Sequence, residues 1–216
     1  MEPLSSTDAV KARKTALRDQ LVTRRGRRSL LEVSQAARGI AEHLMVTSDL
    51  RRAATVAAYV SVDTEPGTGP LLDRLRAMGR RVVVPVVLPD LDLDWAVYDG
   101  PDSLARARRG LLEPTGPRLG LEAVATADVV LTPGLAVDRR GMRLGQGGGC
   151  YDRALGRVPV GTFTCTLLYD GELLDEVPTE AHYRPVTAVV TPSGVTRLTP
   201  GPGPGGPRRP HPPHHP

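Results

Sequence analysis

The stretch GMRLGQGGGCYDRAL, residues 141–155, contains five glycines among its first nine residues and then enters a helical pattern. Glycine loses much conformational freedom on folding, so a glycine-rich loop is typical of places where something approaches the backbone closely. Two arginines, Arg143 and Arg153, lie on either side of the glycines. The stretch therefore predicts a loop that receives an anion and leads into a helix.

The loop matches neither of two common phosphate-binding motifs. A Walker A motif would need Gly-Lys-Ser/Thr after its glycines, and the dinucleotide fingerprint fails because Cys150 occupies its third glycine position. The physical basis of phosphate binding remains, because consecutive glycines let backbone N–H groups converge on an anion at the start of a helix. Arg143 can add a forked, charge-assisted contact.

Asp152 lies in the predicted first helical turn and has two possible roles. It can hold a divalent cation that is shared with phosphates, or it can complement the helix dipole. Without further information the dipole role is favoured.

Two helices are expected before the first strand. The first begins at Thr7 or Asp8 and runs to about Arg25, and the second begins after Ser29, which forms a capping-box pattern with Glu32, and ends near Thr47.

Beyond residue 47, short apolar runs alternate with helical patterns. A helix is expected over Gly69–Met78 and, weakly, over Ser103–Arg109, and another follows the glycine loop. Strands are expected over Thr55–Ser61, Arg81–Val87, Leu93–Tyr98 (on an edge), Asp128–Thr132, Thr162–Tyr169 and Val186–Thr191. This order predicts a three-layer, Rossmann-like α/β domain whose mostly parallel sheet has helices on both faces. Ligands are then expected at the loops after Ser61 and Thr132.

Composition favours a soluble protein of the cytoplasm. Of the 216 residues 40% are hydrophobic and 24% charged, and the net charge is +4. The longest apolar runs are too short to cross a bilayer, no signal peptide is recognised, and two cysteines form no disulfide framework. The few aromatic residues do not interleave with the basic N-terminal run, so nucleic-acid binding is poorly supported.

The chain end differs in composition. Eight of the eighteen residues from Thr199 to Pro216 are proline, so we expect one domain over residues 1–198 and a disordered tail over 199–216. The tail histidines have no converging geometry. Only His43 and His182 remain before the tail, which argues against a histidine-rich metal site.

Residues 131–155, LTPGLAVDRRGMRLGQGGGCYDRAL, resemble the signature of 5-formyltetrahydrofolate cyclo-ligases, also called methenyltetrahydrofolate synthetases. That signature has Pro-Gly after a strand, an aspartate, and then Gly-x-Arg-Leu-Gly-x-Gly-x-Gly-Tyr-Tyr-Asp. Cys150 replaces the first tyrosine, and Val137 replaces a phenylalanine. Lys14-Thr-Ala-Leu-Arg18 is similar to the family's N-terminal Lys-x-x-Leu-Arg, and the segment Tyr59–Glu65 is similar to the one that carries its substrate-binding glutamate.

The resemblance implies conversion of 5-formyltetrahydrofolate to 5,10-methenyltetrahydrofolate with ATP and Mg²⁺, through a phosphorylated formyl group (an iminium phosphate). It implies catalytic roles for Lys14 and Arg143, metal binding by Asp152, and substrate binding by Val60, Glu65 and Tyr151. It implies ATP binding by Lys14, Arg18, Arg143, Leu144, Gly145, Gln146, Gly147, Gly148, Gly149, Cys150 and Tyr151. The partners are then ATP and a reduced folate, and a monomer is expected.

Several residues have a structural alternative. Lys14 and Arg18 can form a solvated helix face, as we expect for most of the basic run to Arg28, and Glu65 can be an exposed loop carboxylate. Cys150 can be a reactive thiol, but a small packing residue is favoured. Trp95 can cover the pterin, but a core residue is favoured.

One position departs from the family pattern. Tyr183 follows His182 where the family tends to have an acidic residue that helps bind metal, so either Glu180 or water completes the metal shell or catalysis is altered. A non-catalytic folate- or nucleotide-binding protein that retains the pocket is the alternative function.

Overall fold

The computed structural model describes residues 6–178 and 184–199, so Glu180, His182, Tyr183 and the tail from residue 200 lie outside the described residues. Seven strands form the main sheet in the order β12-β11-β9-β6-β1-β2-β3. The five inner strands run parallel, and the two edge strands run antiparallel to their neighbours. The strands are β1 (Thr55–Ala57), β2 (Arg81–Val87), β3 (Leu93–Val97), β6 (Val129–Pro133), β9 (Phe163–Leu167), β11 (Ala188–Thr191) and β12 (Gly194–Arg197).

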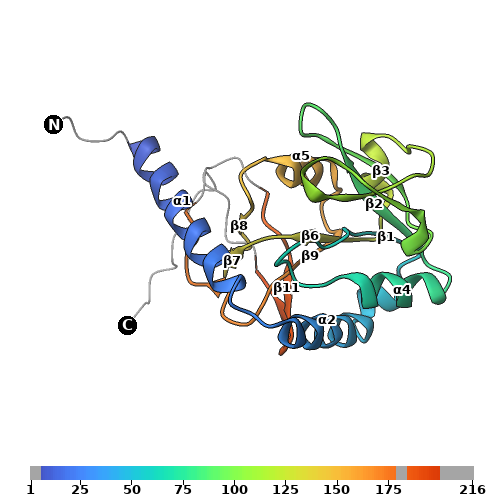
Figure 1. Cartoon of the computed structure of the whole chain (residues 1–216), viewed down its shortest axis with the longest axis horizontal. Helices are drawn as coiled ribbons and strands as arrows, with labels where there is room; N and C mark the ends of the chain where they lie inside the picture. The colour runs from blue at the N-terminus through green and yellow to red at the C-terminus, as the bar shows by residue number, and fades with distance from the viewer. Residues whose placement is uncertain (1–5, 179–183, 200–216) are drawn as a thin grey trace, which may run out of the picture.

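Helices cover both faces of this sheet (Figure 1). On one face lie α2 (Leu30–Met45), the short α3 (Ser48–Arg52) and α4 (Gly69–Ala77), and on the other lie α5 (Cys150–Arg157) and the 3-10 helix η3 (Leu121–Thr126). The central strands β6 and β9 are buried at every position except Pro133, as expected for parallel strands covered on both sides. The predicted three-layer α/β fold is confirmed.

Local sequence accounts for the helix starts. The Ser29 side chain accepts the Glu32 N–H at 3.2 Å while the Glu32 carboxylate accepts the Ser29 N–H at 2.7 Å, which is the expected capping box. Thr47, where the second helix was expected to end, caps α3 by accepting the Leu50 N–H. Trp95 is fully buried, in agreement with its expected core role.

The predicted helix over Ser103–Arg109 is wrong. Residues Leu104–Arg106 form strand β4, which pairs with β5 (Leu112–Pro114) in an antiparallel hairpin. One 3-10 turn, η1 (Pro101–Ser103), precedes β4, and a second, η2 (Arg108–Gly110), lies between the two strands. The cross-strand pairing outweighs the helix preference of the Ala and Arg residues in this segment.

Helix α1 (Ser6–Arg25) lies beside the main body and extends away from it toward the N-terminus (Figure 1). Leu17 and Leu21 attach it to a small apolar cluster that includes Leu135, Leu144 and Val177. This cluster lies at a second sheet of three short strands, β7 (Ala136–Asp138), β8 (Arg143–Leu144) and β10 (Leu173–Leu174). No helix in the described ranges is long and apolar enough to cross a membrane.

Strand β1 is the point at which the strand order reverses, because the chain continues from β1 to β2 on one side and β6 lies on the other. Loops that leave neighbouring parallel strands in opposite directions open a crevice at their carboxyl ends. The loops after β1 and β6 are those at which the sequence predicts a ligand.

Candidate active site

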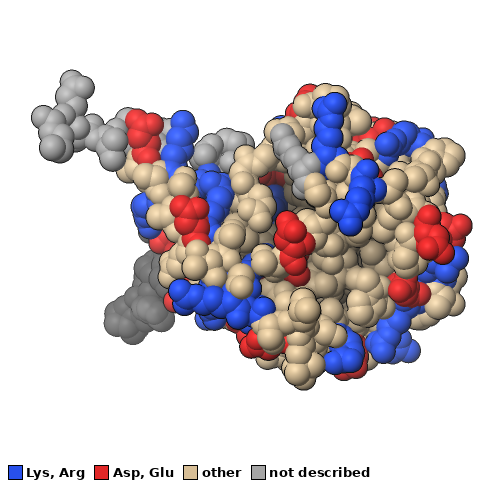
Figure 2. Space-filling model, viewed as in Figure 1, with Lys and Arg blue, Asp and Glu red and all other residues tan. Residues whose placement is uncertain are grey.

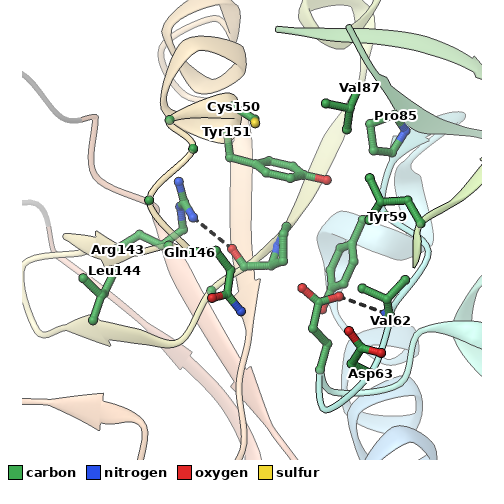
Figure 3. A pocket seen from close by; sticks show the side chains of 18 of the residues that line it. Tyr59, Val62, Asp63, Pro85, Val87, Arg143, Leu144, Gln146, Cys150 and Tyr151 are labelled. Atoms are coloured by element: carbon green, nitrogen blue, oxygen red, sulfur yellow. Dashed lines mark hydrogen bonds between the residues drawn. The ribbon is translucent and has the colours of Figure 1, made fainter. Parts of the chain in front are cut away.

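A cavity of about 640 Å³ opens at this crevice, within the size range of small-molecule sites. Every residue that the sequence assigns to the site lines it: Lys14, Arg18, Val60, Glu65 and the continuous run from Arg143 to Asp152. Figure 3 shows the glycine loop with Arg143 on one side of the cavity and Tyr59, Val62 and Asp63 on the other. Segments that are far apart in the sequence therefore meet at one place.

The glycine loop connects β8 to α5 and ends at Gly149, the N-cap residue of α5, whose φ of 68° is left-handed. Gly147 has a φ of 104°, which also favours glycine. Gly149 has no side chain with which to cap α5, so the first backbone N–H groups of the helix receive no side-chain cap from it. These groups and the helix dipole are suited to an anion.

Two other glycines of the motif make room for protein atoms. A Cβ on Gly141 would lie 2.3 Å from the carbonyl oxygen of Val186, and one on Gly145 would lie 2.7 Å from the Arg143 guanidinium. Close approach by a ligand is therefore not needed to explain these two positions, and the motif combines packing with ligand access.

Arg143 is nearly buried and donates in two directions. One guanidinium nitrogen bonds an Asp152 carboxylate oxygen at 2.6 Å, and the other bonds the carbonyl oxygen of Pro133 at 3.1 Å. The guanidinium carbon lies 5.8 Å from the centre of the Tyr151 ring (Figure 3). Its Nε atom is buried without a partner among the described residues. Its hydrogen bonds thus fix the charge at the cavity wall.

Asp152 lies in the first turn of α5, as predicted, and its direct partner there is Arg143. Its side chain remains 27% exposed. No group of three or more metal-ligating side chains occurs within the described ranges. A single carboxylate beside phosphate oxygens nevertheless fits Mg²⁺, which usually keeps several waters and takes one or two protein carboxylates.

Helix α1 contributes cations to the cavity. Lys14 is only 6% exposed, and Arg18 donates from Nε to the Gly145 carbonyl oxygen at 2.8 Å. The alternative of a solvated face is therefore wrong for these two residues. Figure 2 shows that basic and acidic side chains are mixed on the surface of α1, as they are over the remainder of this face.

The opposite wall carries Glu65. Its carboxylate accepts the Val62 N–H at 3.1 Å, as drawn in Figure 3, and burial raises its pKa above the usual value. The structure thus contradicts an exposed loop carboxylate. Tyr59 and Tyr151 lie nearby with buried hydroxyls that lack a partner in the described part of the chain. Burial also raises their pKa values well above 10, so both remain hydrogen-bond donors at neutral pH.

Several lining residues were not predicted, among them Tyr59, Asp63, Glu113 and Arg25. Arg25 is only 2% exposed, although the basic run to Arg28 was expected to be mostly solvated. The sequence contains a signal that Arg25 faces the cavity with Lys14 and Arg18. Intervals of four and seven residues keep these three side chains on one helix face. Arg153 lies outside the cavity lining and bonds the backbone carbonyls of Asp90 and Leu91.

Comparisons with known proteins show the family to which the chain belongs. Residues 10–192 match the sequence model of the 5-formyltetrahydrofolate cyclo-ligase family. The chain belongs to this family. A 5-formyltetrahydrofolate cyclo-ligase of Mycolicibacterium smegmatis is 45% identical over 67% of this chain and 77% of the relative, and one of Escherichia coli K12 is 35% identical over 80% and 97%.

Solved structures also resemble the chain. The 5,10-methenyltetrahydrofolate synthetase of Aquifex aeolicus superposes with a TM-score of 0.74 at 26% identity, covering 89% of this chain and 96% of that one. The synthetase of Mycoplasma pneumoniae superposes with a TM-score of 0.65 at 20% identity over 83% of this chain and 98% of that one, which supports the fold alone. The predicted family and its enzyme class, a cyclo-ligase, are confirmed.

Proposed function

We propose that this chain converts 5-formyltetrahydrofolate to 5,10-methenyltetrahydrofolate, with cleavage of ATP to ADP and phosphate. Besides membership of the family, one observation carries the proposal: the cavity has a cationic end and a carboxylate end. Lys14, Arg18 and Arg143 line the cavity with the glycine loop, where Asp152 pairs with Arg143, and Glu65 and Asp63 lie on the opposite side. A triphosphate is an anion and suits the cationic end, whereas the edge of a pterin carries N–H donors and suits the carboxylate end.

The triphosphate is assigned to the glycine loop. Residues Leu144 to Tyr151 provide backbone N–H groups and the uncapped start of α5, and Lys14, Arg18 and Arg143 provide positive charge. The Arg18 bond to Gly145 holds the first helix against the loop, so the cations and the backbone donors form one cradle.

The pterin is assigned to the wall that contains Glu65. An ionised carboxylate accepts two N–H bonds from one edge of a pterin, and the Val62 N–H steadies one of its oxygens. Val60 and the ring of Tyr151 line the cavity beside it as apolar surface, and the Tyr59 hydroxyl is a donor within the same wall.

The formyl oxygen of the folate attacks the γ-phosphorus of ATP, and the bond from that phosphorus to the ADP oxygen breaks. The product is an iminium phosphate. N10 then attacks the former formyl carbon and loses its proton, and the C–O bond breaks so that phosphate leaves with the formyl oxygen. Lys14 and Arg143 stabilise the charge on the transferred phosphoryl group, and no protein nucleophile is needed.

Mg²⁺ would be held by Asp152 together with phosphate oxygens, and it would supply further neutralisation of the triphosphate.

All residues of the proposed site come from one chain, and we propose that a monomer is active. Elution of the active protein at twice the monomer mass would contradict this.

Turnover tests the function. Purified protein with 5-formyltetrahydrofolate, ATP and Mg²⁺ should produce the absorbance of the methenyl compound, and omission of ATP should abolish it. Binding of both substrates without product would instead support the non-catalytic alternative.

A further inference from the structure

Arg25, at the last turn of α1, forms a buried ion pair with Glu172. Its Nε and one terminal nitrogen donate to the two carboxylate oxygens at 2.9 and 2.7 Å, and the side chains are 1% and 0% exposed. The two residues are 147 positions apart. Removal of two full charges from water is costly, and a buried ion pair is weak grounds for expecting extra stability. Other contacts of the pair indicate a different role.

One contact leads to the phosphate end of the cavity. The terminal nitrogen of Arg25 also donates to the Gly134 carbonyl oxygen at 2.7 Å. The preceding carbonyl, that of Pro133, accepts the hydrogen bond from Arg143. Two arginines from distant segments therefore hold consecutive carbonyls of one turn, and a displacement of this turn would move Arg143.

Another contact leads to the folate end. Glu172 accepts the backbone N–H of Tyr169 at 2.8 Å, and the Tyr169 hydroxyl donates to the backbone carbonyl of Glu65 at 3.2 Å. Arg28 stacks over the Tyr169 ring at 4.1 Å from its centre. The Arg25 charge also opposes the rise in the Glu65 pKa that burial causes.

We infer that Arg25 and Glu172 form a positioning pair that serves both ends of the site, holding Arg143 through the Pro133–Gly134 turn and Glu65 through Tyr169. This inference rests on the proposed function, because it assumes a nucleotide at one end and a folate at the other. Arginine suits this role because its planar fork binds a carboxylate and a carbonyl together. A lysine keeps the charge but is a single donor centre.

Arg25→Lys tests the pair. We expect a folded protein whose Kd for ATP and Kd for 5-formyltetrahydrofolate both rise, each by about tenfold, the effect of about one lost hydrogen bond. Residues that touch one ligand should differ: Arg18→Met should weaken ATP binding alone and Glu65→Gln folate binding alone. If Arg25→Lys does not fold, Glu172→Gln, which is similar in shape but lacks the charge, should show the same double loss.

Two controls separate positioning from general stability. Leu75→Ala, at a fully buried core residue of α4, should lower the melting temperature without changing either Kd. Arg139→Met removes an ion pair whose side chains are 71% and 92% exposed, and it should change neither property. Wild-type affinities for both ligands in Arg25→Lys, or a loss for one ligand alone, would overturn the inference while leaving the proposed function intact. Failure of the wild type to bind ATP or folate would refute the function, and the inference with it.

Discussion

The Nε atom of Arg18 donates a hydrogen bond of 2.8 Å to the carbonyl oxygen of Gly145, 127 positions later in the chain. This contact makes the first helix part of the glycine loop's binding surface. Lys14 and Arg18 accordingly lie on the face of the helix that is turned toward the cavity.

Arg18→Met should raise the KM for ATP by about ten- to a hundredfold, because it removes the proposed charge-assisted contact to phosphate and the bond that holds the loop. The KM for folate should change little. Arg24→Met is the matched control, since Arg24 is exposed on the same helix and outside the cavity lining. Steady-state kinetics with each substrate varied in turn measure both effects, and an equal loss in the control would argue against a local role.

Gly147→Val should abolish ATP-dependent turnover in a protein that still folds. The φ of 104° strains a β-branched residue by about 1–3 kcal/mol, and the new side chain would occupy the phosphate end of the cavity. Gly161→Val is the control, because Gly161 has a φ of 93° and no described atom outside its chain neighbours lies within 4 Å of where a Cβ would be. It should lose similar stability and keep its turnover. Wild-type ATP affinity in Gly147→Val would refute the phosphate cradle.

Glu65→Gln should weaken folate binding by about ten- to a hundredfold and leave ATP binding nearly unchanged, because an amide accepts at one atom where a carboxylate accepts charge-assisted bonds at two. Calorimetric titration of each ligand measures this. A parallel loss for ATP would assign Glu65 a structural role.

The Glu65→Gln variant also tests how the stability of the protein depends on pH. Burial raises the Glu65 pKa, so the folded protein holds this proton more tightly than the unfolded chain. The stability that protonation contributes is present at acid pH and is lost as pH rises through the raised pKa. Glu65→Gln should therefore melt at a higher temperature than the wild type at neutral pH, and this difference should vanish at acid pH. Folate binding by the wild type should weaken as pH falls through the same pKa.

Truncation after residue 198 should leave turnover and melting temperature unchanged, because the proline-rich tail has few apolar side chains to pack. Assay of the truncated and full-length proteins side by side decides this. A large loss of turnover would place the tail within the enzyme.

The sequence was most informative where local chemistry decides the structure. The capping box at Ser29 and the apolar central strands could be read directly. The hairpin of β4 and β5 could not, because its stability depends on pairs such as Ala105 with Glu113 across a turn, while the segment itself has helix-forming residues. Strand β12 was missed for the same reason, since four residues acquire strand geometry by pairing with β11.

The residues of the site likewise divide into those that the sequence predicted and those that it did not. The glycine loop was recognised by its motif, and the motif together with the family resemblance led to Lys14, Arg18 and Glu65. Arg25 was not recognised, because its partners Glu172 and Gly134 lie 147 and 109 positions away, and an arginine in a basic run resembles solvated surface. The sequence predicted from all five glycines together that a ligand approaches the loop, whereas the nearest atom to a Cβ placed on Gly141 is the Val186 carbonyl oxygen.

The fate of the formyl oxygen tests the central claim most directly. 5-Formyltetrahydrofolate carrying oxygen-18 in its formyl group should be incubated with ATP and the protein, and the released phosphate analysed by mass spectrometry. If the formyl oxygen attacks the γ-phosphorus in this cavity, the label appears in inorganic phosphate in step with the methenyl product. Unlabelled phosphate, or methenyl product without ATP cleavage, would contradict the account.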